Sequence, residues 1–430
     1  MLTPRGMRRI ATVLGACLAA AVTSGVTASA APADFYEVPA SALGGAPGTV
    51  VDTQPYPPLL SIPNQQGPWP SGAQRIMYRT TDAHGAATAA SGTYFDASLP
   101  WIGAGPRPLV VLGPGTQGQG DQCAPSRLFQ DGVHYNAPLD FAVEYEVLQV
   151  HALLSRGIDV VVTDYQGLGT ARMHSYVDRR AQGHAMLDAA RAVKALPGSR
   201  IGDDSPIGFW GYSQGGGASA AAVELAPEYA PELDVRGAFA GAPPADLAAT
   251  LERIDGASLF GAIGYTLNGM AQAYPEARSM IDTELTDRGR QLLADVQDQC
   301  VGETRLQYGM QRSSAFTRTG ESLSTVLSRY PVAQELFAEQ RIGDRTPKAP
   351  VLIQAGVNDD TVPYGQVRQL AKDWCGKGTV VQLSDNTVPP ISPGTGLNHA
   401  LPYPLGIGES LTWVTDRFAG APAPNSCGTL

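Results

Sequence analysis

The spacing of hydrophobic positions changes along the chain and predicts strands alternating with helices. Short apolar runs of the buried-strand type occur at 108–112, 158–163, 207–212, 237–240, 351–355 and 380–383, and a leading antiparallel pair is predicted at 75–80 and 92–95. Helical spacing appears at 180–196 and in the Gly- and Ala-rich segment that begins near Gln214. This alternation favours an α/β fold with a mostly parallel sheet and helices on both faces.

Strand signals stop between Pro244 and Pro350, where helices are predicted at 245–254, 276–298 and 323–341, the last split at Pro331. Crossovers rarely need so much chain, so we interpret 244–349 as a helical cap inserted between two parts of the core, 31–243 and 350–430. Ordinary crossover helices are the alternative. The Pro- and Gly-rich segment 31–70 is interpreted as an irregular arm on the surface.

Composition excludes several classes of protein. Of 430 residues, 43% are hydrophobic and only 16% are charged, which is incompatible with a disordered chain. The formal net charge is −10, and no basic cluster longer than two residues follows the N-terminal segment, which argues against a nucleic-acid partner and against charge-driven membrane association. No stable protein partner is predicted.

The first thirty residues have the pattern of a secretory signal peptide. Arg5, Arg8 and Arg9 precede an apolar run at 10–26, and Ala28-Ser29-Ala30 fits the small-residue cleavage rule. An uncleaved membrane anchor and lipidation at Cys17 are the alternatives. Cleavage near Ala30 predicts a secreted protein and changes the formal charge from −10 to −13, because three arginines and no acidic residue are removed.

Cleavage leaves four cysteines, Cys123, Cys300, Cys375 and Cys427. An even number in an exported chain indicates two disulfides, with three pairings open. A zinc site is the alternative, but widely separated cysteines without a CxxC motif or a nearby His pair do not favour one.

Gly211-Tyr212-Ser213-Gln214-Gly215 matches G-x-S-x-G, the turn that lifts a serine hydroxyl above the end of a strand. A buried-type strand precedes the motif and a helix-forming segment follows it, which is the setting that the motif requires. The alternative is a serine without a catalytic role in a Gly-rich turn. A serine nucleophile needs a histidine base and a carboxylate that orients this base.

The order Ser, acid, His is expected for this turn, and His399 is the one histidine after Ser213. The remaining histidines, His84, His134, His151, His174 and His184, are interpreted as surface or structural residues. For the acid, the predicted strand at 351–355 leads into Asp359 and Asp360. The D-x-x-V-P spacing favours Asp359, and Asp360 is interpreted as a solvated loop charge.

Two backbone donors are expected to stabilise the oxyanion of the tetrahedral intermediate. One is the N–H of Gln214, the residue after the nucleophile. The other is predicted in the glycine-rich loop that follows the strand at 108–112, from Thr116 or Gln117. A flexible turn without this role is the alternative.

These motifs together resemble the secretory lipase family of α/β-hydrolases, the lipase A type, over most of the mature chain. The resemblance rests on the serine turn, on segments 115–118, 123–126, 164–170 and 241–247, and on Asn358, Asp359 and His399. It implies hydrolysis of lipid esters, a helical cap over an acyl-binding tunnel, no cofactor or metal, and disulfides Cys123–Cys300 and Cys375–Cys427. Some members have an aspartate in the first oxyanion loop, where this chain has Thr116 and Gln117.

The sequence therefore predicts a secreted serine hydrolase, a lipase or esterase that contacts an ester or lipid substrate and a lipid–water interface. An acyltransferase or a serine peptidase would use the same residues, and a non-catalytic binding protein would keep the fold. Asp164 is interpreted as structural. The apolar residues at helical spacing in the cap are expected either to line an acyl pocket or to pack in the core; they are Leu259, Phe260, Ile263, Leu267 and Met270.

Overall fold

The computed structural model describes residues 34–62 and 68–430, and residues 35–430 form one compact unit. The predicted signal peptide and Cys17 lie outside the described residues. Because 35–430 is one unit, the limits of the predicted cap at 244 and 349 stay a prediction. No helix within the described ranges is long and apolar enough to cross a membrane.

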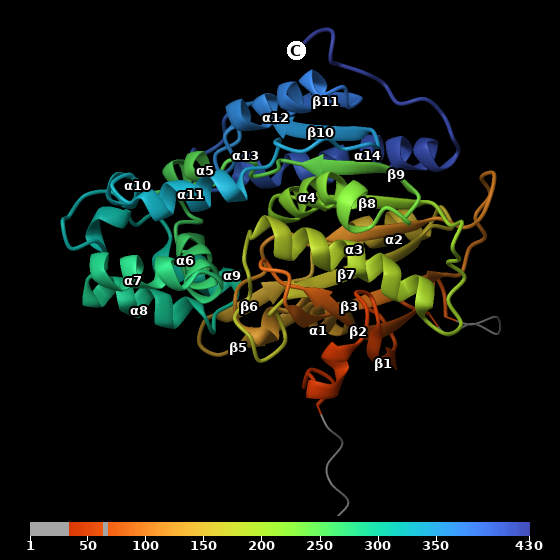
Figure 1. The fold of residues 1–430 in the computed structure, drawn as a ribbon, viewed down its shortest axis with the longest axis horizontal. Helices are drawn as coiled ribbons and strands as arrows, with labels where there is room; N and C mark the ends of the chain where they lie inside the picture. The colour runs from red at the N-terminus through yellow and green to blue at the C-terminus, as the bar shows by residue number, and fades with distance from the viewer. Residues whose placement is uncertain (1–33, 63–67) are drawn as a thin grey trace, which may run out of the picture. The chain divides into compact units, whose positions relative to one another are not determined.

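The core is a nine-stranded sheet in the order β1-β2-β3-β7-β4-β8-β9-β10-β11 (Figure 1). The strands are β1 (Val50–Tyr56), β2 (Ser71–Thr81), β3 (Ala87–Ala97), β4 (Leu109–Gly113), β7 (Asp159–Gln166), β8 (Ile207–Tyr212), β9 (Val235–Gly241), β10 (Val351–Gly356) and β11 (Val381–Asn386). The pairs β1–β2, β2–β3 and β3–β7 are antiparallel, and all later pairs are parallel. This confirms the predicted fold class.

Alternate residues of the central strands pack on opposite faces of the sheet. Val110 and Leu112 of β4 belong to one hydrophobic cluster, whereas Leu109 and Val111 belong to another. The first cluster includes residues of α1 (Pro125–Asp131), α2 (Val147–Leu154) and α14 (Pro402–Phe418); the second includes residues of α3 (Arg179–Ala195), α4 (Gln214–Tyr229) and α12 (Tyr364–Gly376). Burial on both faces explains why these strands read as continuous apolar runs.

Between β9 and β10 the chain is helical and builds a third hydrophobic cluster. Its helices are α5 (Leu247–Ile254), α6 (Ala262–Ala273), α7 (Pro275–Glu284), α8 (Asp287–Val296), α9 (Val301–Tyr308), α10 (Leu323–Leu327) and α11 (Pro331–Gln340). The split at Pro331 is confirmed. The single helix predicted at 276–298 is wrong, because α7 ends at Glu284 and a second helix, α8, begins after Thr286, whose side chain accepts a hydrogen bond from the Gly289 N–H.

The prediction of an irregular arm at 31–70 is wrong in part, since β1 pairs with β2 along the edge of the sheet. Most β1 side chains are exposed or half-buried, so this edge strand has no apolar run to reveal it. The sequence analysis also missed a separate hairpin of β5 (Val133–Asn136) and β6 (Asp140–Val143), and the short helix α13 (Leu397–Ala400).

Candidate active site

Ser213 lies in a sharp turn between β8 and α4. Its backbone has φ 58° and ψ −121°, a conformation that costs free energy in a residue with a side chain and holds the hydroxyl away from the helix. The two flanking glycines are required by close packing. A Cβ at Gly211 would lie 2.1 Å from the Gly215 carbonyl oxygen, and a Cβ at Gly215 would lie 2.0 Å from the Gly113 carbonyl oxygen.

The structure brings Ser213, His399 and Asp359 together from three separate segments. The Nε2 atom of His399 lies 2.8 Å from Ser213 Oγ, and its Nδ1 atom lies 2.8 Å from Asp359 Oδ2. The other carboxylate oxygen of Asp359 accepts hydrogen bonds from the N–H groups of Thr361 and Val362, both at 2.8 Å. A carboxylate can only accept, so Nδ1 carries a proton toward Asp359 and Nε2 is free to accept the serine proton.

The neighbouring Asp360 points to the backbone of the histidine segment. Its carboxylate accepts the N–H groups of Gly396 at 2.9 Å and of His399 at 3.2 Å. The interpretation of Asp360 as a solvated charge is therefore wrong, because the side chain is buried and fixes the loop that carries His399.

The loop at 113–118 packs against the serine turn. The Thr116 hydroxyl lies 2.7 Å from the Tyr176 hydroxyl, and the Thr116 carbonyl accepts a hydrogen bond from Tyr145 at 3.2 Å. Gln117 is buried, and among the described residues its side-chain amide has no hydrogen-bond partner. Gln214 opens α4, and the first N–H groups of a helix have no acceptor within it. The roles of Thr116, Gln117 and Gln214 as oxyanion donors stay a prediction.

The sequence analysis gave His174 no part in the site, yet this buried ring contacts the side chain of Gln214. Burial lowers the pKa of His174 to about 4, so the ring is neutral at pH 7. Its Nδ1 atom lies 3.1 Å from the Gln166 carbonyl, which can only accept, so Nδ1 carries the proton. The Nε2 atom therefore accepts from the Gln214 amide at 3.0 Å. The position next to Gln214 depends on tertiary packing and has no sequence signal.

An apolar cleft extends from Ser213 among the helices between β9 and β10, lined mainly by α5, α6, α7 and α11. Leu259, Ile263, Leu267 and Met270 line this cleft, as one of the two sequence interpretations expects. Phe260 does not line it, and its ring packs against Phe316 at 5.3 Å between centroids. Asp164 is buried below the site and accepts hydrogen bonds from Ser91 and Ser126.

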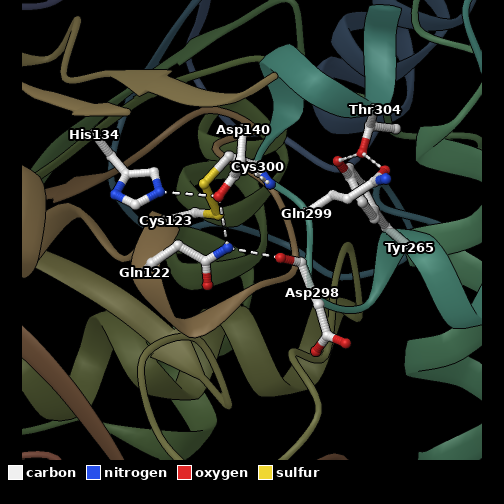
Figure 2. Close-up of a disulfide and its surroundings, with 9 residues drawn as sticks. All are labelled: Gln122, Cys123, His134, Asp140, Tyr265, Asp298, Gln299, Cys300 and Thr304. Atoms are coloured by element: carbon white, nitrogen blue, oxygen red, sulfur yellow. Dashed lines mark hydrogen bonds and ion pairs between the residues drawn. A yellow bond between two sulfur atoms is a disulfide. The ribbon is translucent and has the colours of Figure 1, made fainter. Parts of the chain in front are cut away.

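Two disulfides join Cys123 to Cys300 and Cys375 to Cys427, the pairing that the family resemblance implies. Figure 2 shows the first of them beside His134 and Asp140. These two side chains and Cys300 are close enough to be considered as metal ligands. Because the Cys300 sulfur is already bonded to Cys123, it has no thiolate to offer, and His134 Nε2 lies within hydrogen-bond distance of Asp140, at 2.9 Å.

The family model of the secretory lipases matches residues 134–426. The chain belongs to the secretory lipase family. The chain is 30% identical over 395 residues to a probable inactive lipase of Mycobacterium tuberculosis, covering 90% of this chain and 82% of that one. It is 29% identical over 321 residues to a secreted triacylglycerol lipase of Malassezia restricta, covering 73% of this chain and 65% of that one.

Among solved structures, Candida antarctica lipase A superposes on this chain with a TM-score of 0.76 and 24% identity, covering 92% of this chain and 87% of that one. This similarity confirms the α/β-hydrolase fold. Membership of the family, secreted relatives and two disulfides together support an extracellular location.

Proposed function

We propose that this secretory lipase is an exported serine ester hydrolase that cleaves lipid esters through an acyl-enzyme intermediate. The observation that carries the proposal is the unbroken series of hydrogen bonds from Ser213 through His399 to Asp359, with 2.8 Å at each step. The predicted signal peptide directs export and is cleaved near Ala30.

In the proposed mechanism, Ser213 Oγ attacks the ester carbonyl carbon while His399 Nε2 takes the hydroxyl proton. The tetrahedral oxyanion is held by backbone N–H groups of Gln214 and of Thr116 or Gln117. His399 returns the proton to the leaving alcohol, and an acyl ester on Ser213 remains. Water then adds to this ester with His399 as the base, which releases the acid and restores the serine. Asp359 orients the imidazole throughout and stabilises its cationic form.

The apolar cleft beside Ser213 supports a fatty acyl chain as the part of the substrate that is bound. Most of its lining side chains come from the helices between β9 and β10, and most of them are aliphatic. The relative from Malassezia restricta is a triacylglycerol lipase, which agrees with an acylglycerol substrate. The excess negative charge of the chain is compatible with an uncharged ester.

The similarity to a protein described as a probable inactive lipase makes the activity a matter for experiment. The mature protein is assayed on p-nitrophenyl esters of increasing acyl length, together with Ser213→Ala and with Ser155→Ala, an exposed serine at the end of α2. We expect Ser213→Ala to abolish turnover and Ser155→Ala to retain it. An unchanged rate in Ser213→Ala refutes the mechanism, and the absence of turnover in the wild type leaves a non-catalytic protein. Faster cleavage of amides than of esters favours a peptidase, and acyl transfer to an alcohol in preference to water favours an acyltransferase.

A further inference from the structure

The β5–β6 hairpin has its apolar face turned toward solvent. Val133 pairs with Val143 and Tyr135 pairs with Phe141, so these four side chains project from the same face. Their exposed fractions are 54%, 50%, 67% and 36%. A hairpin on the surface of a soluble protein normally buries such a face and exposes the polar one.

The opposite face of the hairpin is polar and faces the protein. Figure 2 shows Asp140 and His134 directed toward the Cys123–Cys300 disulfide. Asp140 accepts hydrogen bonds from the Cys300 N–H at 3.0 Å and from the Gln122 amide at 3.0 Å, besides its hydrogen bond with His134. The hairpin is therefore held by a buried polar network and a covalent bond next to it, which fix the apolar side chains on the outside.

The exposed surface of this segment carries no carboxylate. Residues 133–148 contain three acids, Asp140, Glu144 and Glu146, and all three are buried. Lysine and arginine are absent from these sixteen positions. The exposed side chains also include Leu139, Tyr145 and Leu148, which extend the apolar surface beyond the two strands. An apolar patch of this kind on a protein with a formal charge of −10 marks a contact site for an uncharged partner.

The same segment continues directly into the support of the candidate oxyanion loop. Tyr145 donates to the Thr116 carbonyl at 3.2 Å, and Glu146 accepts the Gly115 N–H at 2.9 Å. The helix α9 packs on β6, where a Cβ at Gly302 would lie 2.5 Å from the Phe141 carbonyl oxygen and 2.6 Å from its ring, so one edge of Phe141 rests on α9. The hairpin segment is thus joined to the candidate oxyanion loop and to α9.

We propose that the outward face of the β5–β6 hairpin docks this protein on an uncharged lipid surface, an inference that rests on the proposed hydrolysis of lipid esters. Aliphatic side chains beside Tyr135 suit the boundary between acyl chains and water, since the phenol ring is apolar and its hydroxyl is polar. Without basic residues, the face gains nothing from anionic headgroups. Binding is therefore driven by apolar burial and is insensitive to salt.

The test measures flotation of the mature protein with phosphatidylcholine vesicles, using a triple variant with Val133→Thr, Tyr135→Thr and Val143→Thr. Threonine keeps the strand propensity of the hairpin and removes apolar area. We expect about tenfold weaker vesicle binding, since binding scales with buried apolar area, with kcat/KM on a soluble short-chain ester unchanged within about twofold. Ile102→Thr, at a position 88% exposed, is the matched control and retains full binding.

Three results overturn the proposal. The first is equal vesicle binding by the triple variant and the wild type, and the second is vesicle binding that falls steeply with added salt. The third is a wild-type protein that forms a dimer and does not bind vesicles, with the dimer lost in the triple variant. This third result would make the face an interface between copies. If the triple variant loses soluble-ester activity, Tyr135→Thr alone is compared by the same two assays. Binding is also measured on Ser213→Ala, so that vesicle docking is scored separately from catalysis.

Discussion

Replacing Asp359 by asparagine is the most direct test of the charge arrangement at the candidate site. The orientation of the new amide is determined by the backbone, because Thr361 and Val362 both donate to the same carboxylate oxygen at 2.8 Å. The amide oxygen keeps these two hydrogen bonds, so its NH₂ group faces His399 Nδ1. The imidazole then accepts at Nδ1 and carries its proton on Nε2, where it cannot take a proton from Ser213.

The expected loss follows from the cost of restoring the productive form of His399. In that form two buried donors, Nδ1–H of His399 and the new NH₂ group, face each other without an acceptor, and each unsatisfied group costs about 1–3 kcal/mol. The transition state also loses a charged hydrogen bond worth about 1.5–3 kcal/mol. Together these costs amount to about 3.5 to 9 kcal/mol, so we expect kcat to fall at least about 400-fold. KM should change little, because the cleft for the acyl chain is not altered.

The assay is steady-state hydrolysis of a soluble p-nitrophenyl ester at constant pH. Asp360→Asn is the matched control, since it removes the same charge one residue away and touches only the backbone of the histidine segment. We expect it to lose at most about tenfold, because one oxygen acceptor remains for the two N–H groups. A kcat within about tenfold of wild type for Asp359→Asn, or an equal loss in Asp360→Asn, would refute the assignment of the acid.

Three further predictions concern stability and specificity. Burial raises the pKa of Glu146 to about 7. The folded state therefore keeps a proton that the unfolded state loses near pH 4.5, so this residue lowers stability as pH rises from about 4.5 to about 7. Urea unfolding should therefore show Glu146→Gln gaining about 3 kcal/mol relative to wild type between pH 4.5 and pH 8, and a constant difference would contradict this origin. Replacing Cys375 and Cys427 by serine opens a loop of 52 residues and should cost about 4 kcal/mol in the same assay, whereas an unchanged midpoint would show that the bond adds no stability. Leu267→Trp should narrow the cleft and reduce the rate on decanoyl relative to butanoyl esters about tenfold; an unchanged ratio would exclude this part of the cleft as the acyl site.

The sequence best predicted two kinds of element. In one, the pattern of hydrophobic positions follows from burial on both faces, and in the other, a particular turn is obligatory. The neighbouring central strands β4, β8, β9 and β10 are continuous apolar runs because helices cover both sides of the sheet. The break at Pro331 follows from the ring that prevents a helix from continuing. By contrast, β1 is an edge strand with mostly exposed side chains, and its pairing with β2 depends on a neighbour distant in the sequence.

For the candidate site, the chain order and the G-x-S-x-G turn determined which serine, acid and histidine to consider, because this turn fixes the nucleophile at the end of a strand. Only the tertiary structure decided their geometry, the position of His174 beside Gln214 and the use of Asp360 to hold the histidine segment. The same is true of the outward apolar face of the β5–β6 hairpin. Alternating side chains define two faces in the sequence, but which of them meets solvent depends on the polar network and the disulfide that hold the hairpin against distant parts of the chain.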